Sequence, residues 1–188
     1  MASTEPGETL YLALVGHPLL PRENQRFFHL FLPDRLVESI DTRVAGARTT
    51  AFIVLLQAGL DILKQRSGTA EGPLVVDSDR EIHEEGYVLS SDLEADLLHL
   101  ASLPPVKDLL PLLLRVQKRT MIHSRQDFKL ILPKKLANEV EARVQGPRNT
   151  AFIILLSIGL SFYRKRSAQK PTVVHVKTFF KTQGYVAE

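Results

Sequence analysis

Two short segments of the chain show the period-two alternation of apolar side chains that is typical of a β-strand. One side of each segment is apolar, with Phe28, Leu30 and Leu32 in the first and Phe128, Leu130 and Leu132 in the second. The opposite sides carry Phe27, His29, Phe31, Asp127, Lys129 and Ile131. Each segment ends at a proline, Pro33 or Pro133, and proline suits the first turn of a helix. We therefore predict two strands that each lead directly into a helix.

After each predicted strand, the spacing of the apolar residues lengthens to four, which is typical of one buried helix face. This spacing predicts helices over residues 34–44 and 134–144. Gly46 and Gly146 follow where a helix C-cap favours a left-handed residue. Thr49 and Asn149 are residue types favoured at an N-cap, so we expect each to start a second helix, over 50–64 and 150–164.

The second predicted helix is apolar on nearly all sides, which indicates burial on several faces. Gly59 and Gly159 lie in its middle, where glycine costs about 1 kcal/mol relative to alanine. Because both copies keep this glycine, we expect two helices to cross closely there.

These elements form a repeat at an offset of one hundred residues, with 19 of 40 positions identical between residues 28–67 and 128–167. A forty-residue unit is too small to bury a core alone, so we expect the copies to pair. A weaker echo follows, since 73–76 and 86–88 resemble 171–174 and 184–186. Residues 9–15 suggest another strand, and 93–103 and 106–118 suggest linker helices around Pro104 and Pro105.

The expected organisation has five parts. They are an N-terminal extension (1–24), a first repeat (25–67), an acidic arm with linker helices (68–124), a second repeat (125–167) and a basic C-terminal arm (168–188). Between residues 71 and 99 there are nine acidic residues against one arginine, whereas residues 115–181 hold fifteen Lys or Arg against three acids. This split favours a polyanion as the partner of the second half.

The sequence offers no pattern for catalysis or metal binding. The chain has no cysteine, and its six histidines show no ligand spacing, so we expect no metal, cofactor or small-molecule substrate. We find no nucleophile elbow, paired-carboxylate motif or P-loop, so we expect a protein that is not an enzyme. An acidic N-terminus and no long apolar run favour a cytoplasmic protein without membrane attachment.

A strand ending in Leu-Pro, a short helix and the turn Gly-x-Arg-[Thr/Asn]-Thr-Ala-Phe-Ile occur twice without a gap. This arrangement resembles the ribbon–helix–helix (MetJ/Arc) superfamily, and the tandem form resembles the single-chain relaxosome accessory proteins of conjugative plasmid and T-DNA transfer. The resemblance implies a mainly α fold with short β-strands, in which two repeats form an intramolecular pseudo-dimer with an antiparallel two-stranded ribbon. It also implies double-stranded DNA as partner, with a relaxase or other relaxosome protein as a second partner.

The resemblance assigns two groups of DNA-binding residues. The ribbon readers are Phe27, His29, Phe31, Asp127, Lys129 and Ile131. The phosphate anchors are Arg48, Thr49, Thr50, Arg148, Asn149 and Thr150. The resemblance thus implies a relaxosome accessory factor or a plasmid-type transcriptional regulator.

The outer face of the ribbon is unusually apolar, because only Lys129 and His29 suit hydrogen bonds to base edges. Three uses remain open: contact with thymine methyl groups, recognition of DNA shape, or a ribbon covered by the flanking arms. The alternative function is a protein–protein interaction scaffold that kept the fold and lost base reading.

Overall fold

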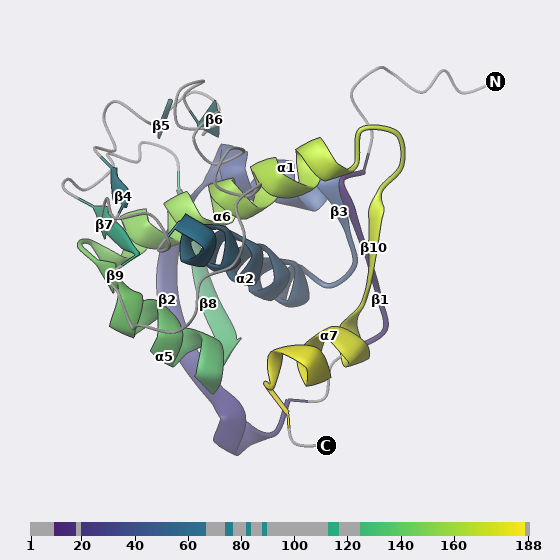
Figure 1. Cartoon of the computed structure of the whole chain (residues 1–188), viewed down its shortest axis with the longest axis horizontal. Coiled ribbons are helices and arrows are strands. Elements are labelled where there is room, and N and C mark those ends of the chain that lie inside the picture. Colours follow the sequence, from purple (N-terminus) through teal and green to yellow (C-terminus); the bar gives the residue numbers. More distant parts are fainter. Residues whose placement is uncertain are drawn as a thin grey trace.

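The computed structural model describes residues 10–17, 20–66, 74–76, 82–83, 88–89, 113–116 and 125–186. These residues form a mixed α/β fold of five α-helices and several short strands (Figure 1). The fold is thus less purely helical than expected, because short parallel strands flank the repeats. The boundaries of the five expected parts are sequence divisions that no observation of the fold tests.

The longest strands come from the two repeats. Strand β2 (Gln25–Pro33) pairs antiparallel with β8 (Arg125–Pro133), and His29 lies opposite Lys129 at the centre of the nine-residue register. The inward residues Leu30, Leu32 and Leu132 are fully or almost fully buried. The predicted antiparallel pairing of the two repeats within one chain is confirmed.

A short helix follows each long strand, as predicted. Helix α1 (Asp34–Arg43) and helix α5 (Lys134–Arg143) begin directly after Pro33 and Pro133, which have extended backbone angles at the N-cap. Each helix buries two residues of the predicted stripe, Leu36 and Ile40 in α1 and Leu136 and Val140 in α5. The last residues of the stripe, Val44 and Val144, lie just beyond the helices.

The expected C-caps at Gly46 and Gly146 are wrong. Helices α1 and α5 end at extended C-caps, because Val44 and Val144 open the two-residue strands β3 (Val44–Ala45) and β9 (Val144–Gln145). The glycines follow these strands with φ of 129° and 121°. A Cβ at Gly46 would lie 2.7 Å from Leu14 Cβ, and one at Gly146 would lie 2.4 Å from the Val116 carbonyl oxygen. Glycine is therefore needed here for a left-handed backbone and for close neighbours, and not for a helix cap.

The second helices are longer than expected: α2 spans Arg48–Arg66 and α6 spans Arg148–Arg166. The N-cap role predicted for Asn149 is wrong, since Pro147 is the N-cap of α6 and no side chain caps it. Thr49 likewise lies inside the first turn of α2. Backbone bonds explain both starts, since the Ala51 N–H donates to the Ala47 carbonyl at 2.9 Å and the Ala151 N–H donates to Pro147 at 3.0 Å.

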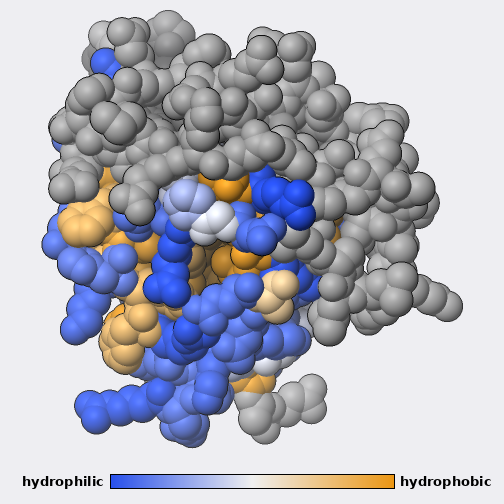
Figure 2. Space-filling view, turned by 90° about the vertical axis from the view of Figure 1, so that its left-hand side faces the viewer, coloured by the Kyte–Doolittle hydropathy of each residue, from blue (hydrophilic) through white to orange (hydrophobic). Residues whose placement is uncertain are grey.

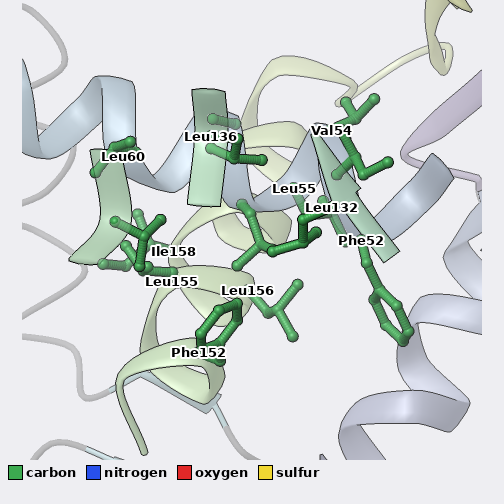
Figure 3. Packing of buried hydrophobic residues seen from close by; sticks show 14 of the residues in the cluster. Phe52, Val54, Leu55, Leu60, Leu132, Leu136, Phe152, Leu155, Leu156 and Ile158 are labelled. Atoms are coloured by element: carbon green, nitrogen blue, oxygen red, sulfur yellow. The ribbon is translucent and has the colours of Figure 1, made fainter. Parts of the chain in front are cut away.

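The core lies where α2 and α6 cross, as Figure 3 shows for Phe52, Leu55, Phe152 and Leu155. A Cβ at Gly59 would lie 2.4 Å from the Leu155 carbonyl oxygen, and one at Gly159 would lie 2.1 Å from that of Leu55. The predicted close crossing is confirmed, and it is reciprocal between the two copies.

The rings of the ribbon pack across the repeats. Phe28 of β2 contacts Phe152 of α6 with ring centroids 5.5 Å apart, and Phe128 of β8 contacts Phe52 of α2 at 5.6 Å. Each strand therefore packs on the long helix of the other repeat, so neither repeat has a core of its own.

Two three-stranded parallel sheets lie on opposite sides of the crossed helices in Figure 1. In one sheet, β1 (Leu12–Val15) lies between β3 and β10 (Thr172–His175). In the other sheet, β7 (Leu114–Val116) lies between β9 and β4 (Leu74–Val76). The strand after each long helix thus joins the sheet of the other repeat.

This exchange explains the first part of the weaker sequence echo, 73–76 with 171–174, because β4 and β10 are equivalent strands in equivalent sheets. The second part has no common structure, since Val88 opens strand β6 (Val88–Leu89) whereas Val186 lies beyond helix α7 (Val176–Gln183). The strand expected within 9–15 is confirmed by β1. The helix expected over 106–118 is wrong at its end, where residues 114–116 form β7, because this apolar stretch completes a parallel sheet. The helix expected over 93–103 lies outside the described residues.

Residues 168–186 of the C-terminal arm contain a strand and a helix. After β10 the chain forms helix α7 (Val176–Gln183) and ends its turn at Gly184, which is left-handed with φ of 73°. The buried Tyr185 hydroxyl donates to Gln57 Oε1 of α2, and Gln57 Nε2 donates to Asp61 Oδ1 at 2.8 Å. Burial raises the pKa of Asp61 and that of Tyr185. The remaining described elements are a one-turn 3-10 helix η1 (Arg22–Asn24) before β2, and an antiparallel pair of two-residue strands, β5 (Ile82–His83) and β6 (Val88–Leu89).

We predict that Gly159→Ala lowers the free energy of unfolding by about 1–3 kcal/mol, the usual cost of overpacking. The added methyl group would overlap the Leu55 carbonyl oxygen, which is backbone and has little freedom to move. Urea denaturation measures the change, with Ser161→Ala on the same helix as control. Equal stability of the two variants would contradict the close crossing.

Candidate nucleic-acid interface

The outer face of the ribbon is open to solvent at its centre. His29, Asp127 and Lys129 are exposed, and Phe27 is 58% exposed, unusually high for a large apolar residue. Phe31 and Ile131 are half-buried. The structure thus brings all six predicted readers onto one strand pair, with Phe27 opposite Ile131 and Phe31 opposite Asp127.

Several of these side chains contact one another. The His29 imidazole Nε2 contacts the Asp127 carboxylate, and the His29 ring lies 5.1 Å from the Phe31 ring. The Lys129 ammonium lies 5.5 Å from the centre of the Phe27 ring. The face therefore carries one ammonium group beside one aromatic ring, and one negatively charged carboxylate beside His29.

The N-termini of α2 and α6 carry the predicted phosphate anchors. Because the first amides bonded along these helices are those of Ala51 and Ala151, the N–H groups of residues 48–50 and 148–150 stand at the helix ends. Such ends favour anions through oriented amides and the helix dipole. The Thr50 and Thr150 side chains are buried, so these residues can offer an anion only backbone groups. Thr49 is exposed and Asn149 is half-buried.

The two anchor arginines are exposed, and each lies over a ribbon phenylalanine. The Arg48 guanidinium carbon is 5.3 Å from the Phe128 ring centre, and that of Arg148 is 5.2 Å from the Phe28 ring centre. This reciprocal stacking places one guanidinium at the start of each long helix, beside the ribbon.

Each anchor also lies near an acidic residue that sequence reasoning missed. Arg48 donates from Nε and Nη2 to the Asp41 carboxylate at 2.9 and 2.5 Å, and these bonds raise the pKa of Arg48. Arg148 Nη2 lies 3.6 Å from Glu141 Oε1. The sequence contained a sign of this pairing, because in both copies an acidic residue stands seven positions before the arginine.

A small cavity of about 220 Å³ lies next to the second anchor. Its lining includes Phe28, Glu141, Gly146, Arg148 and Phe152. The cavity therefore lies between the end of α5 and the start of α6, on the inner side of the ribbon.

Figure 2 shows one face of the molecule on which the described side chains are mostly hydrophilic, with hydrophobic ones set among them. Across the described ranges, no group of three or more His, Asp or Glu side chains could hold a metal ion. None of the helices in the described part of the chain is long and apolar enough to cross a membrane.

Comparisons with protein families, curated proteins and solved structures found no match to this chain.

Because the chain contains no cysteine, engineered pairs can test the ribbon in solution. His29 and Lys129 are direct partners, and directly opposite Cβ atoms are about 4.5–5.5 Å apart, close to disulfide range. We predict that His29→Cys with Lys129→Cys oxidises to a disulfide within the monomer, seen as a mobility shift on a non-reducing gel.

The control pair is Phe31→Cys with Ile131→Cys, which lies on the same face but four residues out of register. It should stay reduced as a monomer, because four strand residues span about 13 Å. Cross-linked dimers as the main product of the His29 and Lys129 pair would contradict a ribbon formed within one chain.

Proposed function

We propose that this chain is a DNA-binding protein of the tandem ribbon–helix–helix type and that it is not an enzyme. The observation that carries the proposal is the reciprocal arrangement of one exposed ribbon between two helix N-termini, each with an arginine. In this proposal the repeats form a pseudo-dimer, so one chain supplies what a dimer of single repeats would supply.

A two-stranded ribbon fits the major groove of duplex DNA, where base edges and thymine methyl groups are accessible. Lys129 and His29 would contact acceptor atoms of bases, and Phe27 would contact thymine methyls. The N-termini of α2 and α6 would hold phosphates on both sides of the groove. The exposure of Phe27 supports direct apolar contact over a ribbon covered by the arms.

The finer assignment follows from the resemblance alone. We propose an accessory factor of a plasmid or T-DNA transfer relaxosome, or a plasmid-type transcriptional regulator, acting in the cytoplasm. A relaxase or another relaxosome protein would be the second partner.

One observation favours a second candidate function, a protein–protein interaction scaffold. Phe27 is exposed beside the apolar Ile131, and Asp127 would face the negative potential of a DNA groove. An apolar patch that includes an acidic group suits a protein partner better than it suits DNA.

We predict that Arg148→Ala weakens binding to every duplex by a similar factor and reduces the salt slope by about one unit, as expected for a phosphate contact. Fluorescence anisotropy against salt concentration measures both values. Arg148→Lys is the matched control, since it keeps the positive charge and should keep most of the slope. Unchanged affinity of Arg148→Ala for all duplexes would remove this anchor from the proposal.

We also predict that the protein alone prefers its best site over random duplex by no more than about a thousandfold, the low end of the usual range. The ribbon offers one lysine and one histidine as polar readers, and one good bidentate base contact gives about 1–3 kcal/mol of discrimination. Competition between selected and scrambled duplexes measures the ratio. A far greater preference that disappears in Lys129→Ala would show that the ribbon reads sequence strongly.

A further inference from the structure

The two anchor arginines differ in how firmly acidic neighbours hold them. Arg48 makes two hydrogen bonds to Asp41, so both carboxylate oxygens are engaged. Glu141 is the acidic residue that corresponds to Asp41 in the second repeat, and its Oε1 lies 3.6 Å from Arg148 Nη2. The Arg148 side chain is correspondingly more exposed, at 61% against 47% for Arg48.

Glu141 is instead bonded to Arg26 of β2. Arg26 donates from Nη1 and Nη2 to the two Glu141 oxygens at 2.7 and 2.6 Å, and from Nη1 to Asn138 at 3.1 Å. Such a two-point arginine–carboxylate pair is a strong, directed contact. The Arg26 hydrogen bond is the main reason that the pKa of Glu141 lies below its usual range, and Arg148 makes a smaller contribution.

The repeat explains why only one half has this contact. The residue equivalent to Arg26 in the second copy is Gln126, and the residue equivalent to Glu141 in the first copy is Asp41. A neutral glutamine cannot take the place of arginine in an ion pair with Asp41. Arg48 therefore bonds to Asp41, whereas Glu141 is already occupied by another arginine.

We infer that Arg26 is a positioning residue that occupies Glu141 and thereby leaves Arg148 available to a DNA phosphate, while Arg48 is held by Asp41. The chain then binds the phosphates of duplex DNA mainly through the start of α6. The two halves therefore contribute unequally to DNA affinity despite their similar folds. This inference rests on the proposed DNA-binding function, and it adds that the second repeat binds phosphate more strongly than the first.

The test is a double-mutant cycle in duplex binding, measured by anisotropy over a range of salt concentrations. Arg26→Gln gives the first copy the glutamine of the second, and it should weaken binding about two- to fivefold as Glu141 captures Arg148. Glu141→Gln should abolish this penalty, so Arg26→Gln should have no further effect in that background. Equal losses in both backgrounds would mean that Arg26 contacts DNA itself, which would overturn the inference.

An exchange variant supplies a result that mere damage to the fold would not produce. In the wild-type background, Arg148→Ala should cost more affinity than Arg48→Ala. With Arg26→Gln and Gln126→Arg combined, an arginine can occupy Asp41, so Arg48→Ala should become the more costly change.

An unchanged rank order of the two anchors in the exchanged background would overturn the inference and leave the proposed function standing. Failure of the wild-type chain to bind any duplex would overturn both. Thermal unfolding of each variant shows whether a loss of binding follows from a loss of folded protein.

Discussion

Backbone contact between two long helices is the constraint on which the rest of the structure depends. Gly59 lies against the Leu155 carbonyl and Gly159 against the Leu55 carbonyl. In both places the backbones are so close that a Cβ atom would overlap the carbonyl oxygen. Once α2 and α6 cross this closely, Phe28 reaches Phe152 and Phe128 reaches Phe52. The ribbon is therefore held on a core that both copies build together, and neither forty-residue unit buries one alone.

The exchange of β4 and β10 extends this mutual dependence beyond the helices. Each of these strands follows the long helix of one repeat and completes the parallel sheet of the other. Through this pairing each of the two strands is held by the repeat that does not precede it. The two copies then differ mainly at their surfaces, as with Arg26 and Gln126, where substitution costs little folding energy. In the proposed function, that freedom allows one half to bind phosphate more firmly than the other.

Local periodicity predicted the two long strands and both helix pairs, and two retained glycines predicted the helix crossing. The antiparallel pairing of the strands followed from the repeat and from the resemblance, and not from periodicity. The sequence did not predict that Val44 and Val144 open short strands, since the partners of those strands, β1 and β7, are distant in sequence. The same limit applies to the anchors. Arg48 and Arg148 could be found from a repeated turn, whereas the control that Arg26 has over Glu141 requires knowledge of which strand faces which helix. Long-range pairing decides those contacts, and periodicity carries no information about it.

The most direct test of the proposed function is to ask which exposed apolar residue touches DNA. A photo-crosslinking phenylalanine analogue can replace Phe27 on the ribbon or Val173 on β10, which have similar exposures of 58% and 55%. The two positions are matched in accessibility and sample different surfaces. The account predicts duplex crosslinks from position 27 that increase at low salt, and few from position 173. Two results would contradict it. One is a duplex crosslink from position 173 with none from position 27, and the other is that position 27 crosslinks to protein partners and never to DNA.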